Sequence, residues 1–474
     1  MLIFELSSRG RRGYRLPRLD VERINPEEYF GDYYREDLKF PDVSELEVVR
    51  HYTKLSQLNY GVDTTMVPLG SCTMKYNPRI NEELANKDTH PMTPDEQAQG
   101  LLRMMYQLKE LLKEIGGFKE VSLQPAAGAH GELLGLLIIL AYHGDRENPH
   151  KRKVLVPDTS HGTNPATASL CGFEVITVKS DQEGELDWED FQRKLTDSVA
   201  CLMITNPNTL GIFERRIKKI ADALHEKDAL LYMDGANMNA LVGMAKPGHW
   251  GVDVMHFNLH KTFSTPHGGG GPGGGAIGVS DRLEPYLPVP QVVFDGNRYR
   301  LDWNRPKSVG KVLTFYGHTA VMLRALLYIL SYGSELDKVA KYALLNSSYL
   351  KHLLKGLFLD PYEGVPPMHE FVLSAKNLLK YGVNAMDIAK ALLDRGFYAP
   401  TIYFPLTVKE ALMIEPTETE SLTTLESFAQ SLWDIVEMAK RDPSALRGSP
   451  KNTPVRRIKE AEASRKPILK ASWA

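Results

Sequence analysis

The fold is decided by the stretch ALLYMDGANMNALVGMAKPGHWGVDVMHFNLHKTF, which spans residues 229–263. It contains two short apolar runs, 229–234 and 252–257, and each has the length of a buried strand. Asp234 ends the first run, and Lys261 follows the second. Because ligands in open α/β sheets bind at the carboxyl ends of the strands, both polar residues are candidates for a site.

The same kind of apolar run recurs on both sides of this stretch. We expect strands at 120–124, 153–157, 173–178, 199–205, 229–234, 252–257 and 276–279. Helical patterns lie between most of them, for example at 131–143 and 214–227. Strands that alternate with helices predict an α/β domain with a mostly parallel sheet.

The remaining sequence predicts appendages and a second domain. Loop-rich text such as PLGSCTMKYNP (68–78) tends to be functional or to meet a partner. Helical patterns dominate residues 311–358 and 383–396, and a further helix is expected at about 420–441. The tail has little periodicity, which favours a surface arm over a partner-binding tail. We therefore predict an N-terminal arm with a loop-rich segment, a large domain, a small C-terminal domain and a C-terminal arm, at 1–95, 96–330, 331–441 and 442–474.

The composition excludes several functional classes. The chain has 474 residues, 43% hydrophobic and 24% charged, with a formal net charge of -2. These values are ordinary for a globular protein and give no electrostatic basis for binding nucleic acid or an anionic membrane. Cys72, Cys171 and Cys201 are too scattered for a disulfide framework or a thiolate zinc site. The longest apolar stretch, 133–142, is about half a membrane span, and we expect a cytoplasmic protein without a targeting segment.

Asp234 and Lys261 together suit pyridoxal 5′-phosphate. Lys261 has Phe257, Leu259 and Phe263 around it, and partial desolvation makes a lysine amine a usable nucleophile. Such an amine holds the cofactor aldehyde as a Schiff base, while an acid keeps the pyridine nitrogen protonated. Taken singly, Asp234 could be an ordinary turn residue and Lys261 an ordinary exposed lysine without a function.

A phosphate site is predicted where QPAAGAHGELLGLL (124–137) runs from a strand into an apolar helix. Ala127, Gly128 and Ala129 are small enough for backbone N–H groups to approach an anion at the helix N-terminus. A simple strand-to-helix turn would look similar. His130 in that turn is a candidate to stack on the cofactor ring, although a lone histidine is more often structural.

Asn206 ends another apolar strand and is a candidate to donate a hydrogen bond to the phenolic oxygen of the cofactor. The alternative is turn chemistry, because Asn-Pro favours turns. The chain order of phosphate turn, Asn206, Asp234 and Lys261 is much more specific than any one of these elements.

The glycine run HGGGGPGGGAIGV (267–279) contains G-x-G-x-x-G at Gly269, Gly271 and Gly274. A dinucleotide fingerprint opens a helix, whereas this run leads into a strand, so a nucleotide site is rejected. We interpret the run as room for close backbone approach beside Lys261.

No metal site is predicted, although His256, His260 and His267 lie close together in the sequence. The metalloprotease motif needs a glutamate after its first histidine and a helix. Here Phe257 follows His256 in strand text.

At this point the sequence resembles one family, the P-protein of the glycine cleavage system. The resemblance rests on PLGSCTMKYNP (68–78), HPMTPDEQAQG (90–100), SHGTNPATA (160–168), MDGAN (233–237), FNLHKTFSTPHGGGGPGGG (257–275) and LMIEPTETES (412–421). It covers most of the chain and points to the C-terminal, lysine-bearing half of the P-protein, which is subunit 2 of the two-subunit bacterial form. It implies an α/β, fold-type I (aminotransferase-like) architecture.

The resemblance also implies site residues. Lys261 matches the Schiff-base lysine and Asp234 the partner of the ring nitrogen, and both are catalytic candidates together with His161. The implied cofactor contacts are Ala127, Gly128, Ala129, His130, Thr163, Asn206, Asp234, Ala236, Asn237, His260 and Lys261.

The implied reaction is the decarboxylation of glycine with transfer of the aminomethyl group to the lipoyl arm of H-protein. The implied assembly is an α2β2 heterotetramer with P-protein subunit 1. Two alternatives stay open: another fold-type I enzyme, such as an aminotransferase or serine hydroxymethyltransferase, and a non-catalytic scaffold subunit. The pair of Asp234 and Lys261 argues against the scaffold.

Overall fold

The computed structural model describes residues 2–36, 38–85, 93–268, 273–314 and 316–469. The chain forms two compact units, Met1–Tyr60 and Gly61–Ala474. The first unit consists of η1 (Ile3–Leu6), α1 (Pro26–Phe30), η2 (Gly31–Tyr33) and α2 (Glu45–Gln57). Among its described residues only Val43 is buried, so this unit has almost no core of its own.

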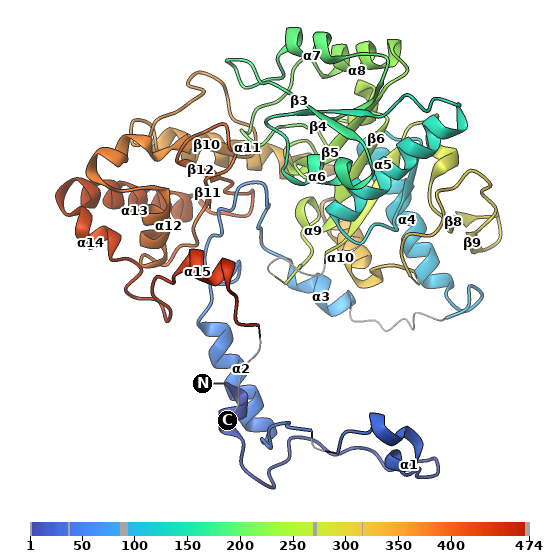
Figure 1. Cartoon of the computed structure of the whole chain (residues 1–474), viewed down its shortest axis with the longest axis vertical. Helices are drawn as coiled ribbons and strands as arrows, with labels where there is room; N and C mark the ends of the chain where they lie inside the picture. The colour runs from blue at the N-terminus through green and yellow to red at the C-terminus, as the bar shows by residue number, and fades with distance from the viewer. Residues whose placement is uncertain (1, 37, 86–92, 269–272, 315, 470–474) are drawn as a thin grey trace. The chain divides into compact units, whose positions relative to one another are not determined.

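The second unit is built around a seven-stranded sheet (Figure 1). Its strands are β1 (Glu120–Ser122), β2 (Lys153–Pro157), β3 (Glu174–Val178), β4 (Val199–Thr205), β5 (Leu230–Gly235), β6 (Val254–Asn258) and β7 (Gly275–Val279). The order across the sheet is β1-β7-β6-β5-β4-β2-β3, and β7 runs antiparallel to both of its neighbours. The pairs β6·β5, β5·β4, β4·β2 and β2·β3 are parallel. The prediction of a mostly parallel α/β sheet is therefore confirmed.

Helices cover both faces of this sheet because the side chains of each strand alternate between two apolar layers. Leu230 and Tyr232 of β5 join one buried cluster, while Leu231 and Met233 join the other. The helices and short helical turns up to residue 262 are α3 (Arg79–Ala85), α4 (Gln99–Gly116), α5 (Gly128–Asp145), α6 (Thr163–Leu170), α7 (Trp188–Lys194), α8 (Ile217–Glu226), η3 (Met238–Ala240), η4 (Pro247–Trp250) and α9 (Leu259–Thr262).

A second, smaller sheet follows in the C-terminal part of this unit. After η5 (Glu284–Tyr286), the hairpin of β8 (Gln291–Phe294) and β9 (Tyr299–Asp302), α10 (Thr319–Tyr332), η6 (Gly333–Glu335) and α11 (Asp337–Leu353), the chain forms β10 (Phe371–Ser374), β11 (Thr401–Ile402) and β12 (Ala411–Ile414). The helices associated with this sheet and the tail are η7 (Ala375–Tyr381), α12 (Ala385–Leu393), α13 (Leu422–Arg441), α14 (Pro443–Arg447) and α15 (Glu460–Arg465).

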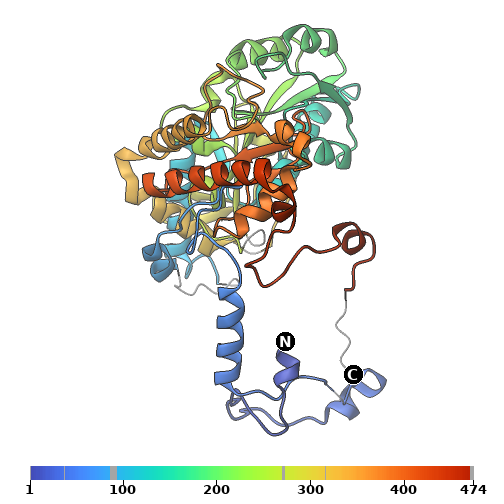
Figure 2. The ribbon, with the colours of Figure 1, turned by 90° about the vertical axis from the view of Figure 1, so that its left-hand side faces the viewer.

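The small sheet is buried on both faces. Leu373 and Leu412 pack with α12 and α13, which lie on one side of it in Figures 1 and 2. Val372 and Met413 face the other way and pack against Leu210, which follows β4. This second contact brings the small sheet to the carboxyl end of a large-sheet strand.

Within the described ranges, no helix is both long enough and apolar enough to cross a membrane. The apolar stretch 133–142 forms the middle of α5, which packs on the large sheet. The domain boundaries proposed after residues 95, 330 and 441 stay predictions.

Candidate active site

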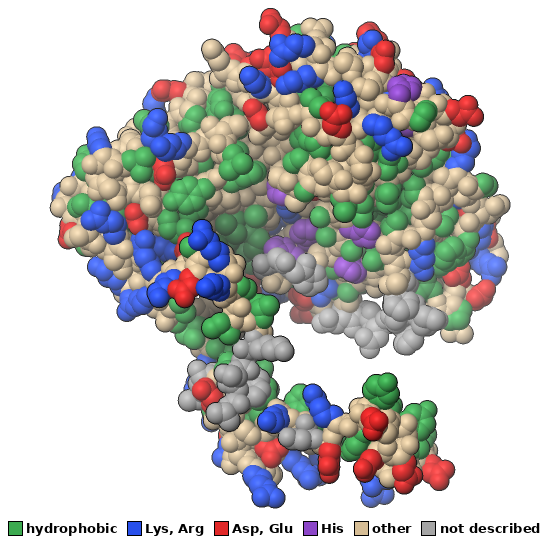
Figure 3. Space-filling model, in the orientation of Figure 1, with side chains coloured by type: hydrophobic (Ala, Val, Ile, Leu, Met, Phe, Trp, Pro, Cys, Tyr) green, Lys and Arg blue, Asp and Glu red, His purple; other side chains and the backbone are tan. Residues whose placement is uncertain are grey.

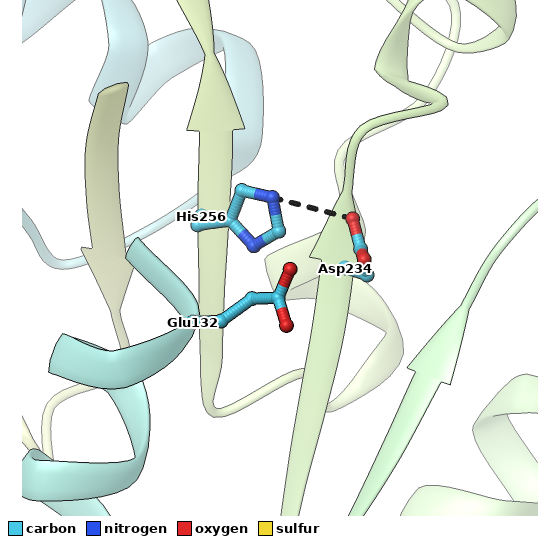
Figure 4. A group of neighbouring side chains, drawn as sticks. All are labelled: Glu132, Asp234 and His256. Atoms are coloured by element: carbon cyan, nitrogen blue, oxygen red, sulfur yellow. Dashed lines mark ion pairs between the residues drawn. The ribbon is translucent and has the colours of Figure 1, made fainter. Parts of the chain in front are cut away.

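The predicted strand-end residues lie at the carboxyl ends of β5 and β6, which are neighbours in the sheet. Asp234 of β5 pairs in register with His256 of β6. Figure 4 shows the carboxylate of Glu132, from α5, pointing toward both of these side chains. All three are almost fully buried. The sheet register and the helix that crosses it thus create a compact polar cluster.

Asp234 is held by two hydrogen-bond donors and by an ion-pair contact. Asn164 Nδ2 donates to Oδ2 at 2.9 Å, and the backbone N–H of Ala236 donates to Oδ1 at 2.8 Å. His256 Nε2 lies 3.2 Å from Oδ1. Burial disfavours the carboxylate, but the neighbouring histidines and these hydrogen bonds outweigh it and hold the pKa of Asp234 below its ordinary value. Asp234 is therefore a fixed buried anion at the end of a sheet strand.

His256 is fixed on both ring nitrogens. Its Nδ1 lies 2.5 Å from the Tyr232 hydroxyl, and its Nε2 faces Asp234. Burial lowers the pKa of His256, although the charge of Asp234 acts in the opposite direction. The ring of His256 is thus held between the Tyr232 hydroxyl and the Asp234 carboxylate.

Glu132 provides a second carboxyl group beside Asp234. The hydroxyls of Thr163 and Thr167 donate to it at 2.6 and 3.2 Å. Burial and the charge of Asp234 raise the pKa of Glu132 to about 7, and the threonine hydrogen bonds reduce the effect. Two carboxyl groups of opposite pKa shift thus lie side by side.

His161 and Thr163, both predicted site residues, lie beside this cluster. His161 Nδ1 is 2.8 Å from the Thr163 hydroxyl. Burial lowers the pKa of His161, and the opposing charges of Asp234 and Lys261 both act on it. His161 is therefore within electrostatic reach of the acid and the amine.

His130 has different surroundings. Its Nδ1 accepts the backbone N–H of Ala126 at 3.1 Å. Burial and the charge of His318 lower its pKa. The ring thus forms a hydrogen bond within the predicted phosphate turn. The space-filling view in Figure 3 shows several histidine side chains gathered in a hollow on this face of the second unit.

The predicted phosphate turn does open a helix. Ala127 is the N-cap of α5, with extended backbone and no side-chain cap, so the N–H groups of the first turn are directed outward. A Cβ on Gly128 would lie 2.6 Å from Asn258 Oδ1, and one on Gly275 would lie 2.8 Å from the Ala127 carbonyl oxygen. The turn therefore fits tightly against the strands that flank Lys261, while Ala129 stays exposed.

The glycine run is described only in part. Gly269 and Gly271 lie outside the described residues, whereas Gly274 is described. The backbone N–H of Leu259 donates to the Gly274 carbonyl at 2.9 Å, and His260 Nδ1 lies 3.1 Å from the same oxygen. Burial lowers the pKa of His260 to about 4. His260 thus connects Gly274, near the end of the glycine run, to α9.

Lys261 lies on α9 directly after β6. Its Nζ donates to the carbonyl oxygen of Ser71 at 2.6 Å. Ser71 belongs to the loop text PLGSCTMKYNP, so a segment that the sequence indicates as functional meets the candidate lysine.

Asn206 and Asn237 line the same end of the sheet. Asn206 Oδ1 accepts the backbone N–H of Glu214 at 3.0 Å. Its Nδ2 is buried and has no hydrogen-bond partner within the described part of the chain. Asn237 Nδ2 donates to the Pro207 carbonyl at 2.8 Å and lies 3.2 Å from Glu370 Oε1. Asn206 therefore offers a free donor, whereas the amide donor of Asn237 is engaged.

The sequence interpretation missed several residues of this region. Asn164 stands inside the quoted motif SHGTNPATA, and a histidine in a strand as buried as β6 was a usable signal for His256. Glu132 stands one turn into a helix that otherwise looks apolar. Glu370 and Glu415 come from the small sheet, and only the tertiary structure brings them to the loop that contains Ser71.

Two groups of three potential metal ligands arise from these residues, and in each the ligand atoms lie within 4.8 Å of one another. They are Glu132, Asp234 and His256, and His369, Glu370 and Glu415. In the first group, the two carboxyl groups accept hydrogen bonds from other residues, and His256 forms an ion-pair contact with Asp234. The second borders the loop that meets Lys261.

Comparison with known proteins identifies the family. The model for the glycine dehydrogenase C-terminal domain matches residues 339–452, and the model for aminotransferase class-V matches residues 136–273. A probable glycine dehydrogenase (decarboxylating) subunit 2 from Aquifex aeolicus (strain VF5) is 69% identical over 474 residues, covering 99% of this chain and 98% of the relative. The chain belongs to the glycine dehydrogenase (decarboxylating) subunit 2 family.

Other members of the subunit 2 family agree with this assignment. The relative from Alkaliphilus oremlandii (strain OhILAs) is 51% identical over 478 residues, and the alignment covers 99% of this chain and 98% of the relative. The family predicted from the sequence motifs is thus confirmed, and so is the assignment to a glycine dehydrogenase.

Solved structures with the same fold include fold-type I enzymes. Glycine decarboxylase (P-protein) of the glycine cleavage system, in inhibitor-bound form, superposes with a TM-score of 0.72 at 20% identity, covering 86% of this chain and 93% of that one. Cysteine desulfurase from Thermococcus onnurineus NA1 superposes with a TM-score of 0.60 at 14% identity, covering 79% and 95%. The predicted aminotransferase-like architecture of the subunit 2 family member is confirmed.

Proposed function

We propose that this chain catalyses the decarboxylation of glycine with pyridoxal 5′-phosphate bound at Lys261, and passes the aminomethyl group to the lipoyl arm of an H-protein. The observation that carries this proposal is the sequence similarity, over nearly the full length of the chain, to relatives named glycine dehydrogenase (decarboxylating) subunit 2. The reaction assigned to them needs an electron-withdrawing cofactor, and the residues at the strand ends suit this one.

Three features of the site fit the cofactor. The open N-terminus of α5 at Ala127–Ala129 suits its phosphate. The unpartnered Nδ2 of buried Asn206 suits its phenolic oxygen. The buried Asp234 carboxylate suits a protonated pyridine nitrogen, because each of its hydrogen bonds favours the charged form.

When bound, the cofactor withdraws electrons from the bond that breaks between Cα and the carboxylate of glycine. Asp234 keeps the proton on the ring nitrogen, and Asn164 and Ala236 keep Asp234 in place. The Lys261 amine would hold the cofactor. We assign a part in the reaction to His161 rather than to His130, because the charges of Asp234 and Lys261 act on His161, whereas His130 is hydrogen-bonded within its own turn.

The overall reaction balances with one proton. The carboxylate of glycine leaves as carbon dioxide, and its Cα forms a bond to one sulfur of the lipoyl disulfide. The other sulfur becomes a thiol and takes up the proton. We propose that a P-protein subunit 1 completes an α2β2 assembly, and that the complex acts in the cytoplasm.

The proposal is tested by borohydride reduction of the protein with pyridoxal phosphate, followed by peptide mapping. We expect the pyridoxyl label on Lys261. Label on Lys75, a buried lysine that contacts Glu418, would overturn the assignment. Lys261→Ala should remove the label and the turnover while leaving the far-ultraviolet circular dichroism unchanged, because one strand-end side chain contributes little packing.

The substrate is tested separately by exchange of labelled bicarbonate into the carboxylate of glycine, in the presence of lipoylated H-protein and subunit 1. We expect exchange that depends on both proteins. Free transamination by the assembled complex without such exchange would refute glycine decarboxylation.

A further inference from the structure

The loop at residues 69–75, the 69–75 loop, has a backbone that needs external support. Ser71 and Thr73 have φ angles of 60° and 47°, in the left-handed region that side-chain-bearing residues rarely adopt. Such a conformation is strained for a residue with a side chain, and it persists only where the surrounding structure enforces it. The contacts that enforce this loop are therefore informative.

Two buried glutamates hold these two residues. The backbone N–H of Ser71 donates to Glu370 Oε2 at 2.5 Å, and its hydroxyl donates to Oε1 at 3.1 Å. The backbone N–H of Thr73 donates to Glu415 Oε2 at 2.9 Å. Both glutamates are 0% exposed. Each left-handed residue thus has its own carboxyl group.

The small sheet places these carboxyl groups side by side. Glu370 immediately precedes β10 and Glu415 immediately follows β12, and the antiparallel register pairs the adjoining residues Phe371 and Ile414. The rigid edge of a three-stranded sheet therefore fixes the spacing of the two acceptors.

The arrangement is energetically costly. Burial raises the pKa of Glu370 well above its ordinary value, and the charge of Glu415 raises it further. Burial also raises the pKa of Glu415 to about 7 and lowers that of His369 to about 3, so His369 supplies no counter-charge. Both ring nitrogens of His369 lack a hydrogen-bond partner among the described residues. Burying polar groups without full hydrogen bonding costs stability, so such a cluster calls for a functional explanation.

The supported loop positions one carbonyl group, that of Ser71. The Ser71 carbonyl oxygen accepts the Lys261 amine at 2.6 Å. A continuous series of contacts therefore leads from the edge of the small sheet, through Glu370 and Ser71, to the candidate lysine of the large sheet.

We propose that Glu370 and Glu415 are positioning residues that hold the 69–75 loop so that the Ser71 carbonyl receives the Lys261 amine whenever the amine is not bound to the cofactor. This inference rests on the proposed function of Lys261. A lysine that is displaced by substrate and must later return needs a defined resting place. The loop supplies it within reach of the reaction, and the two glutamates keep it from collapsing toward an ordinary backbone conformation.

The same cluster has three potential metal ligands, but its contacts favour the positioning role. One oxygen of each glutamate already accepts a backbone N–H from the loop, and the charge of Lys261 acts on both carboxyl groups. A neighbouring ammonium group disfavours an additional cation. A bound metal is therefore an outcome of the test that would overturn the proposal.

The test uses the full chain free of cofactor and measures how fast acetic anhydride labels Lys261, by peptide mapping. Glu370→Ala removes the support of Ser71, and we expect labelling to become about tenfold faster, the effect of losing a hydrogen bond to a charged group. Glu370→Gln keeps an acceptor for the Ser71 N–H and should restore the slow rate. Glu415→Ala frees the other end of the loop and should act in the same direction as Glu370→Ala, which provides a second variant if the first does not fold.

Glu410→Ala is the matched control. It also removes a carboxylate that accepts a backbone N–H, that of Ala385 at 2.8 Å, but it belongs to the cap of α12. We expect no change in Lys261 labelling. Equal acceleration in this control, an unchanged rate in Glu370→Ala, failure of Glu370→Gln to restore the slow rate, or a stoichiometric metal that Glu370→Gln loses would each refute the positioning role. Because labelling is measured without cofactor, these outcomes are distinct from failure of the borohydride test.

Discussion

Replacing Glu132 by glutamine tests the electrostatics of the acid pair beside the candidate lysine. The new amide would keep an oxygen acceptor for the Thr163 hydroxyl, and its NH₂ group could donate to the Thr167 hydroxyl, since a hydroxyl accepts as well as donates. The change therefore removes the ionisable group and keeps the packing. What it isolates is the cost of holding a second negative charge next to Asp234.

The magnitude follows from the pKa of Glu132, which burial and Asp234 raise from 4.5 to about 7. A shift of this size corresponds to about 3 kcal/mol. Because the pKa is raised in the folded state, the folded protein binds more protons than the unfolded chain between these two values. The contribution of Glu132 to the free energy of unfolding is therefore most favourable below the unfolded pKa. This contribution is lost as the pH rises through about 7.

The assay is urea unfolding of the cofactor-free chain, followed by tryptophan fluorescence. We expect Glu132→Gln to be more stable than the wild type by about 1 kcal/mol at pH 5 and by about 3 kcal/mol at pH 8.5. The exposed Glu226→Gln controls for the general effect of the replacement and should show no such dependence on pH. A stability difference between Glu132→Gln and wild type that stays constant from pH 5 to pH 8.5 would refute the raised pKa.

Three further changes probe the cofactor site. Asp234→Asn should lower turnover by roughly a hundredfold or more in the exchange assay, because a neutral amide no longer favours a protonated ring nitrogen; near-normal turnover would contradict the assigned role. Asn206→Ala should weaken cofactor binding about tenfold in an absorbance titration, since its free Nδ2 is the proposed donor; an unchanged dissociation constant would remove Asn206 from the site. Gly128→Ala should cost about 1–3 kcal/mol of stability and weaken cofactor binding, because its Cβ would lie 2.6 Å from Asn258 Oδ1; wild-type values in both measurements would show that the turn adapts.

The sequence by itself determined the elements of the large sheet and indicated the two residues that we propose for the chemistry. Each strand is a short apolar run bounded by turns, so local patterning was sufficient to find all seven. Asp234 and Lys261 could be paired because consecutive parallel strands bring their carboxyl ends to one edge of the sheet. The motifs then determined the family.

Only the tertiary structure decided what surrounds these residues. Glu132 and His256 look like parts of an apolar helix and strand. Glu132 reaches Asp234 because of how α5 crosses the sheet, and His256 reaches it through the register of β5 and β6. Glu370 lies far from Ser71 along the chain, and nothing local indicates that a strand edge of a second sheet supports the loop. Side-chain periodicity reports which face of an element is buried, but the partner across a buried interface is selected by the packing of whole elements, and so it emerges only in the folded chain.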